Sequence, residues 1–442
     1  MPIQAGANAI AITPSTTQFL AGYPHVDRYS TGVDTELYSS ALYLDDGTES
    51  CLLIGNDLIY LGKAYIQAVR DDIAARTGLA ANRIMVTCTH SHSAPVTYGK
   101  MPYGDDASRP GPDEKYMAWL HDRIVTGAVA AVGAARTAEI GYGFGDSSQV
   151  GGNRRYPKGK SNPRVPVVFV RDAHTHAPLA LMMVTCVHPT VLHEDSTLVG
   201  GDFPGHARQH LQQALGNIPI VYHTGTSGNQ SPRHWTRENT VAEAGRLGGL
   251  LAASVREAVT DLSFTDNVSL HVDRVEVDLP LNTFPPVAEA EKREREAFVR
   301  FDRMRRERAD PRATRTAECD WFGAERRLSL ARAFASGKLE RIVRETVLPA
   351  EIQAVRVGPW TFVAWPGEVF VEFGLAVNAA RPDAFVIAYA NGTTQGYLVT
   401  AEAVQEGGYE AANAALKSPE SPQILVDKTL EILSRDGFQH PP

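Results

Sequence analysis

The sequence contains no long hydrophobic run, because none of its apolar stretches approaches the roughly 20 residues needed to cross a bilayer. Its N-terminal stretch, MPIQAGANAIAITPS, has neither a basic region nor a long apolar region, so it does not fit a secretory signal. We therefore expect neither a membrane-spanning nor a secreted protein. The prediction is a cytoplasmic location without a stable membrane anchor.

Cysteine is also scarce, and the net charge is negative. The 442 residues include 4 cysteines, and none of them forms the C-x-x-C pairs of zinc knuckles, so free thiols in a reducing compartment are expected. The formal net charge of -8 argues against nucleic acid as a partner. A hydrophobic content of 43% is ordinary for a globular protein, and an enzyme fits this composition.

Three short apolar runs end at side chains that can bind a metal. The runs and the residues that follow them are RIMVTCT at 83–89 before His90 and His92, LALMMVTCV at 179–187 before His188, and TFVAW at 361–365 before Pro366, Gly367 and Glu368. Each run is rich in β-branched or aromatic residues and bounded by turn residues, which predicts a buried strand. Ligands gather at the carboxyl ends of strands in open α/β sheets. Two or three histidines and a carboxylate there suit a zinc site.

Strand and helix patterns are mixed along the rest of the chain. Further strands are predicted at 51–54, 140–145, 165–171, 218–223, 268–281, 352–357 and 385–389, and helices at 63–76, 113–137 and 240–262. The segment 51–89 reads as a βαβ unit, whereas 268–281 alternates as a half-buried antiparallel strand does. We predict the α/β (mixed α+β) class, with one large domain over residues 1–442 whose mixed β-sheet is flanked by helices.

A charged segment interrupts this pattern. Residues 288–345 are rich in Lys, Arg and Glu and have high helix propensity, which predicts an inserted helical hairpin broken near Asp310 and Pro311. The charges fit a solvated helix face. A lid over the site and a homo-oligomer contact are the alternatives.

Two local patterns bear on chemistry. His90 and His92 point the same way if the strand continues through them, so one can bind metal while the other donates to substrate or takes a proton. The loop 224–232, TGTSGNQSP, is rich in Gly, Ser and Asn and can offer backbone N–H groups to an oxyanion, although a plain turn explains it equally well.

Several ordered motifs together resemble one known family. They are ITPS near the start, THSHSAP at 89–95, Asn153-Arg154, HPT and GGDFPGHA between 188 and 207, GNQSP at 228–232, WPGE at 365–368, and GYLVT with YEAA between 396 and 412. In this order they resemble the catalytic N-terminal domain of the neutral/alkaline non-lysosomal ceramidases, which are zinc amidases. The resemblance spans nearly the whole chain. It implies one zinc per chain, held by His90, His188, Glu368 and Tyr397.

The resemblance also implies roles for residues around the metal. His92 would be hydrogen-bonded to the zinc-bound water or the substrate, and Arg154 would bind the polar end of the substrate. Tyr409 would help to stabilise the oxyanion, and Ser231 would line the catalytic site. Asp202 would contact the substrate or support the site.

The chain departs from the family in two places that concern the substrate. The family's neutral continuation after NxSP is replaced by Arg233 and His234, which adds a cation near the substrate's polar end. The family's C-terminal sandwich domain has no counterpart in this sequence. We therefore expect a small soluble amide as substrate in place of membrane ceramide.

These observations predict a zinc-dependent amidohydrolase that cleaves a linear amide (N-acyl) bond with metal-activated water. His92 would pass a proton to the leaving amine. The alternatives are a zinc esterase, lactonase or phosphoester hydrolase, a ceramidase proper, and a non-catalytic ligand-binding protein.

Overall fold

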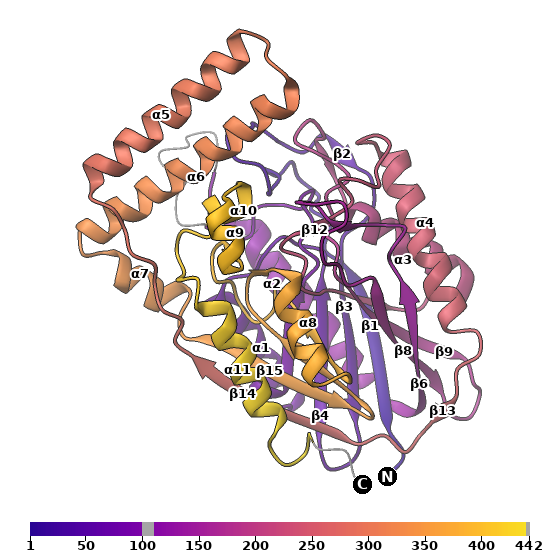
Figure 1. Ribbon diagram of the computed structural model, residues 1–442. Coiled ribbons are helices and arrows are strands. Elements are labelled where there is room, and N and C mark those ends of the chain that lie inside the picture. Colours follow the sequence, from indigo (N-terminus) through magenta and orange to yellow (C-terminus); the bar gives the residue numbers. More distant parts are fainter. Residues whose placement is uncertain (100–109, 439–442) are drawn as a thin grey trace.

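The computed structural model describes residues 1–99 and 110–438, and its largest element is a nine-stranded sheet (Figure 1). Its strands are β1 Gln4–Ala11, β3 Tyr38–Asp45, β4 Ser50–Asn56, β5 Ile84–Cys88, β6 Arg136–Asp146, β8 Arg164–Asp172, β9 Pro178–Thr185, β11 Ile220–Thr224 and β13 Phe264–Thr265. They run in the order β11-β9-β8-β6-β1-β3-β4-β5, and β13 pairs with β6 outside this path. The neighbours β4 and β5 are parallel, as are β9 and β11, whereas the other pairs are antiparallel.

The sheet consists of two halves, because β1 and β6 pair only at Gln4–Thr137 and Ala5–Arg136. In the first half, Leu52 and Ile54 of β4 pack in a cluster with helices α1 (Lys63–Thr77) and α2 (Glu114–Gly133). Leu53, between them, packs into a second cluster on the opposite face. This alternation is that of a strand buried on both faces.

The second half is built in the same way. Leu181 and Met183 of β9 pack with helices α3 (Asp202–Leu215) and α4 (Val241–Ala258), whereas Met182 joins the same interior cluster as Leu53. The two halves therefore share one apolar interior, with a helix pair outside each. The strands β4 and β11 approach so closely that a Cβ at Gly55 would come within 2.6 Å of the Tyr222 carbonyl oxygen, which requires glycine there.

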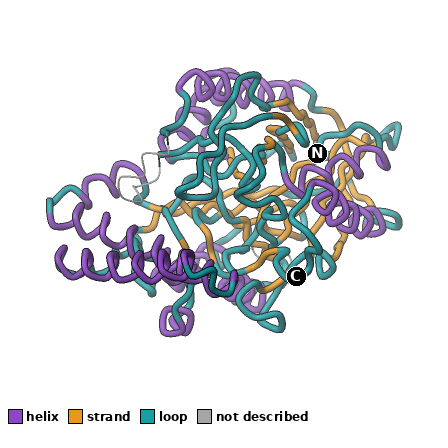
Figure 2. Tube along the Cα trace, turned by 90° about the horizontal axis from the view of Figure 1, so that it is seen from above, coloured by secondary structure: helices purple, strands orange, loops and turns teal. Residues whose placement is uncertain are grey.

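A second sheet closes this interior. Its strands are β14 Leu270–Val277, β15 Ala350–Val357, β16 Trp360–Ala364 and β18 Ala384–Ile387, in the order β14-β15-β16-β18. Val355 and Phe362 face the shared interior, and the other face is covered by α8 (Val371–Ala380) and α11 (Ser421–Leu433). Seen from above, the strands lie inside and the helices lie around them (Figure 2).

The remaining strands form short two-stranded pairs. These pairs are β2 Gly32–Val33 with β10 Leu198–Val199, β7 Gly152–Asn153 with β12 Gln230–Ser231, and β17 Glu368–Val369 with β19 Tyr397–Leu398. The other short elements are a 3₁₀ turn at Ala81–Arg83 and the helices α9 Ala401–Glu406 and α10 Tyr409–Asn413. The third pair places Glu368 opposite Tyr397.

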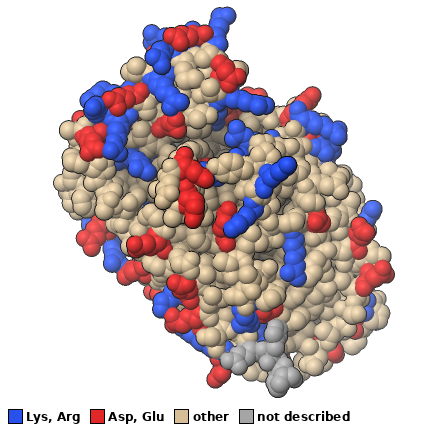
Figure 3. All heavy atoms as spheres, viewed as in Figure 1, with Lys and Arg blue, Asp and Glu red and all other residues tan. Residues whose placement is uncertain are grey.

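The charged insertion forms α5 (Val287–Arg306), α6 (Pro311–Ala335) and the short α7 (Leu339–Thr346). The pair α5 and α6 projects from the sheets, and acidic and basic side chains are interspersed over its surface (Figures 1 and 3). The predicted break is confirmed: the Asp310 carboxylate caps α6 by accepting the N–H of Ala313 at 2.9 Å, and Pro311 occupies the first helical position. Arg326 of α6 donates to the carbonyl of Gln395, so the pair is anchored to the body of the protein.

The predicted mixed α/β class is confirmed, and the helix at 63–76 is close to the observed α1. The helix predicted at 113–137 is wrong at its end, since α2 stops at Gly133. Arg136 and Thr137 instead pair with β1, and this tertiary contact overrides local helix propensity. No helix in residues 1–99 or 110–438 has both the length and the apolar character of a membrane span.

Candidate metal centre

One candidate ligand follows a strand in each of three sheet layers, which are the two halves of the nine-stranded sheet and the four-stranded sheet. His90 follows β5, His188 follows β9, and Glu368 follows β16. Nε2 of His90 lies 3.6 Å from Oε2 of Glu368, and Nε2 of His188 lies 3.5 Å from the same oxygen. All three side chains are buried. The structure therefore brings the three strand-end residues to one point.

Backbone carbonyls orient both imidazoles. Nδ1 of His90 lies 3.1 Å from the carbonyl oxygen of Ile59, and Nδ1 of His188 lies 2.6 Å from that of Ser227 and 3.2 Å from that of Gln230. A carbonyl oxygen can only accept, so each Nδ1 carries the proton. Each Nε2 then keeps its lone pair for the cluster, as a metal ligand must. The loop 224–232 thus contributes carbonyl oxygens that hold His188.

Glu368 is oriented by a turn and by a phenol. Gly367 precedes it with a φ of 112°, a backbone conformation that favours glycine. The hydroxyl of Tyr60 donates to Oε1 of Glu368, which leaves Oε2 near both histidines. Burial and the neighbouring Glu368 carboxylate raise the pKa of Tyr60 well above its usual value, so the phenol remains a donor.

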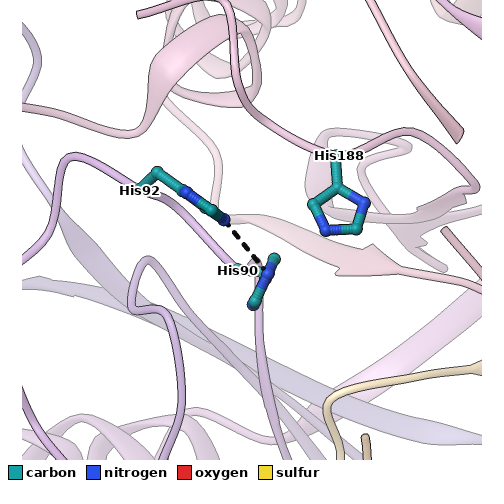
Figure 4. Close-up of side chains that lie close together, drawn as sticks. All are labelled: His90, His92 and His188. Atoms are coloured by element: carbon teal, nitrogen blue, oxygen red, sulfur yellow. Dashed lines mark hydrogen bonds between the residues drawn. The ribbon is translucent and has the colours of Figure 1, made fainter. Parts of the chain in front are cut away.

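His92 lies beside the cluster, with its Nε2 3.2 Å from Nε2 of His90 (Figure 4). His90 and His92 were expected from the sequence to point the same way if the strand continued through them. The strand does not continue, because β5 ends at Cys88 and His90 has a left-handed φ of 65°. Candidate ligand atoms of His90, His92 and His188 nevertheless lie within 4.8 Å of one another. His92 can therefore act either as a third histidine ligand or as a proton carrier beside the metal.

His188 is held in its neutral form. Burial lowers its pKa from 6.5 to about 4, and the positive charge of Arg154 contributes in the same direction, outweighing the opposing effect of Glu368. A neutral imidazole is the form that binds a metal ion. The electrostatics around His188 therefore favour a ligand over an acid.

Arg154 links Tyr397 to a buried carboxylate. Its Nη2 donates to the Tyr397 hydroxyl at 3.0 Å, and its Nε donates to Oε1 of Glu410 at 2.7 Å. Burial disfavours the guanidinium charge, but the interactions with Tyr397 and Glu410 outweigh this effect and raise the pKa of Arg154. Burial and the Glu368 charge raise the pKa of Tyr397, and the Tyr409 ring lies 5.8 Å from that of Tyr397. The phenol is thus protonated beside a permanent cation.

Ser231, Arg233 and Asp202, which were also predicted to contribute to the site, have different surroundings. Ser231 is buried in β12, where its Oγ accepts the N–H of Arg233 at 3.2 Å, and the Arg233 side chain is exposed. Asp202 is fully buried, and its Oδ2 accepts the N–H groups of Val191 at 3.0 Å and Leu192 at 2.9 Å. Burial raises the pKa of Asp202 to about 6. Asp202 therefore stabilises the loop that follows His188.

Two tyrosines of the site, Tyr60 and Tyr389, were not predicted from the sequence. The Tyr389 ring stacks on His90 with ring centres 4.1 Å apart, and its hydroxyl lies 3.5 Å from Nε2 of His188 and 2.8 Å from Oγ of Ser227. Its backbone is left-handed, with a φ of 53°. Tyr60 follows β4 and Tyr389 follows β18, each within a few residues. Their position after a strand end, which pointed to the histidines, could therefore have pointed to both tyrosines.

The donor set fits a divalent transition metal. Two histidines that offer Nε2, one carboxylate oxygen, and a third histidine beside them are ligands that zinc and related ions prefer. This fold and site define the class of the protein. It is a mixed α/β protein with a buried histidine cluster that can bind a metal at the carboxyl ends of its strands.

No family model matches the chain, and no curated protein matches it. Solved structures do share its fold. A neutral ceramidase from Pseudomonas aeruginosa has a TM-score of 0.72 and 18% identity, over 100% of this chain and 76% of that chain. A ceramidase complexed with C2 has a TM-score of 0.72 and 16% identity, over 100% of this chain and 77% of that chain. The chain therefore has a neutral ceramidase-like fold, and the predicted resemblance is confirmed at the level of the fold.

Proposed function

We propose that this protein is a zinc-dependent hydrolase that cleaves a linear amide bond. The observation that supports it most directly is the convergence of Nε2 of His90, Nε2 of His188 and Oε2 of Glu368, with both Nδ1 atoms held by carbonyls. These residues would hold the ion, with Tyr397 or His92 completing the set. Zinc is the metal that the ceramidase resemblance implies.

When bound, zinc would supply a Lewis acid that polarises the scissile carbonyl and lowers the pKa of water towards ~7. The protein's own residues orient the amide and move protons. His92, half-buried beside His90, takes a proton from the attacking water and gives it to the leaving nitrogen. With His92 in this role, Tyr397, whose hydroxyl accepts from Arg154, would complete the metal set, and Tyr409 beside it would donate its O–H to the carbonyl oxygen of the substrate.

The proposed substrate is a small amide in place of membrane ceramide, and the proposed location is the cytoplasm. Nucleic acid is not a proposed partner, because the formal net charge is -8. The α5–α6 pair is anchored to the residues before Tyr397 through Arg326, which supports a role next to the site.

The test is a substrate panel with matched acyl groups: N-acyl amides, the corresponding esters, and phosphodiesters, with products identified by mass spectrometry. We expect release of free amine from the amides, and a loss of at least about 100-fold in kcat/KM for Glu368→Gln. Glu402→Gln, an exposed change on α9, is the control and should match the wild type. Hydrolysis of esters or phosphodiesters alone, or full amidase activity in Glu368→Gln, would overturn the proposal.

A further inference from the structure

A cavity of about 360 Å³ lies between the α5–α6 pair and the segment that carries Tyr397. Tyr397, which also accepts the hydrogen bond from Arg154, is one of its lining residues, so the cavity reaches the candidate metal centre at this residue. Its charged lining residues are all cations: Arg293, Arg327 and Lys417. No Asp or Glu among the described residues lines it.

Lys417 is the most buried of these cations. Its side chain belongs to a residue only 4% exposed, and its Nζ has no hydrogen-bond partner in the part of the chain that the structure describes. Asp278 is the carboxylate that acts on it electrostatically, but Asp278 already accepts from Arg344 at 2.5 Å. A buried ammonium without a partner is costly. Burial accordingly lowers the pKa of Lys417 to about 7.

Arg327 is a second cation without a counter-ion. No hydrogen bond or ion pair joins its guanidinium to another residue within 1–99 or 110–438. Burial lowers the pKa of Arg327, and the positive charge of Arg293 acts in the same direction. Arg293 itself is paired with Glu289 one turn away on α5. The cavity therefore carries positive charge that no carboxylate among the described residues neutralises by an ion pair at Lys417 or Arg327.

Apolar side chains form much of the rest of the wall, and Asn282, Thr283 and Ser418 add uncharged polar groups. Phe284, Leu398, Val399 and Val404 line the same cavity. A volume of about 360 Å³ lies in the range of pockets that take small organic ligands. Walls of this kind fit a short aliphatic chain that ends in an anion.

We propose that this cavity binds a carboxylate carried by the amide substrate, with Lys417 and Arg327 as its counter-ions and the amide bond directed towards Tyr397. The inference rests on the proposed amidase function and names its substrate class: acylated amino acids, or half-amides of dicarboxylic acids. The two differ in whether the carboxylate lies on the amine half or on the acyl half. The shared feature is an acid group separated from the amide by a short apolar spacer.

The kinetic test compares N-hexanoylglycine, the mono-hexylamide of glutaric acid, and neutral N-hexanoylglycinamide. We expect the wild type to prefer one of the two acids over the neutral amide by at least about 30-fold in kcat/KM. Lys417→Met and Arg327→Met should remove most of this preference and leave the neutral amide within about twofold. Lys428→Met, on the exposed face of α11, is the matched control and should behave as the wild type. The preferred acid identifies the half that carries the carboxylate.

A binding measurement separates failure of this inference from failure of the amidase proposal. Isothermal titration with hexanoate should show binding to the wild type and none to Lys417→Met, with 1-hexanol as the uncharged control. If no amide is hydrolysed but hexanoate binds in this pattern, the amidase proposal fails and the anion site stands. If amides are hydrolysed but hexanoate does not bind, and Lys417→Met treats acids and neutral amides as the wild type does, the anion site is refuted. Lys417→Met should fold, since methionine replaces an unpaired buried ammonium with an apolar chain of similar length.

Discussion

Oε2 of Glu368 lies 3.5 Å from Nε2 of His188, although the two residues follow strands of different sheets. Val355 and Phe362 of the four-stranded sheet pack in the same interior cluster as Met182 of β9. Close packing transmits small shifts of one layer to the next. The geometry of the metal centre therefore depends on the apolar interior as well as on its own ligands.

Removing the Tyr60 hydroxyl should weaken metal binding without unfolding the protein. Tyr60 donates to Oε1 of Glu368 and fixes the direction of Oε2. We expect Tyr60→Phe to lower zinc affinity by about 10- to 100-fold, as measured by competition with a chromogenic chelator. Tyr65→Phe removes a hydroxyl that donates to the Met117 carbonyl at 3.0 Å, and should leave the affinity unchanged. Equal affinities of Tyr60→Phe and wild type would contradict the role of this phenol.

The ion pairs of Glu410 should contribute far more to the free energy of unfolding than that of Glu406. The Glu410 carboxylate is buried and accepts from both Arg154 and Arg155, whereas Glu406 is exposed and pairs with Arg155. Glu410→Gln should lower the free energy of unfolding by about 3 kcal/mol, and Glu406→Gln by less than about 1 kcal/mol. Urea denaturation measures both. Similar losses in the two variants would argue against a buried Arg154–Glu410 pair.

His223 should make stability depend on pH. Burial lowers its pKa from 6.5 to about 3, so between these values the unfolded chain binds a proton that the folded protein does not. The free energy of unfolding should fall by about 1.4 kcal/mol for each pH unit from ~6.5 towards ~3 on account of this residue.

His223→Gln should reduce that slope by the same amount, as measured by urea unfolding of metal-free protein between pH 5 and pH 7. His174→Gln, on the exposed turn between β8 and β9, provides the comparison and should keep the wild-type slope. An unchanged slope in His223→Gln would show that His223 is not held neutral by burial.

A side chain at Gly323 should separate the inserted helices from the site. A Cβ there would collide with Ala412 of α10, the helix that begins at Tyr409. We expect Gly323→Val to lower the free energy of unfolding by about 1–3 kcal/mol and to reduce kcat. Gly133→Ala, where a Cβ meets open space, is the control for a glycine change in a helix. If Gly323→Val kept the wild-type kcat, the packing of the α5–α6 pair against α10 would have no role in catalysis.

Strand-end positions were predictable because local patterns decide them. The apolar runs before His90, His188 and Glu368 are short, β-branched and bounded by turns, so β5, β9 and β16 could be located from the sequence. Asp310 and Pro311 likewise marked the start of α6 through capping chemistry. The division of these strands among three sheet layers was not predictable, because it depends on the pairing of residues far apart in the chain.

The sequence predicted which residues form the site better than it predicted how their side chains are oriented. The left-handed turn at His90 has no strong local signal, since it depends on tertiary contacts of Nδ1 with Ile59. Tyr60 was missed because a tyrosine after a strand usually serves packing. Lys417 was missed because nothing local distinguishes a lysine that is buried without a partner. These are properties of packing between distant segments.

The most direct test is the metal content of the purified protein, measured by inductively coupled plasma mass spectrometry after reconstitution with zinc and removal of free ion. The wild type should retain one zinc per chain, and amidase activity should follow that content through a cycle of chelation and zinc addition. His188→Ala should retain almost none, and His174→Ala, a surface change, should match the wild type. A wild-type protein that retains no transition metal, or that retains as much in His188→Ala as without the substitution, would contradict the account.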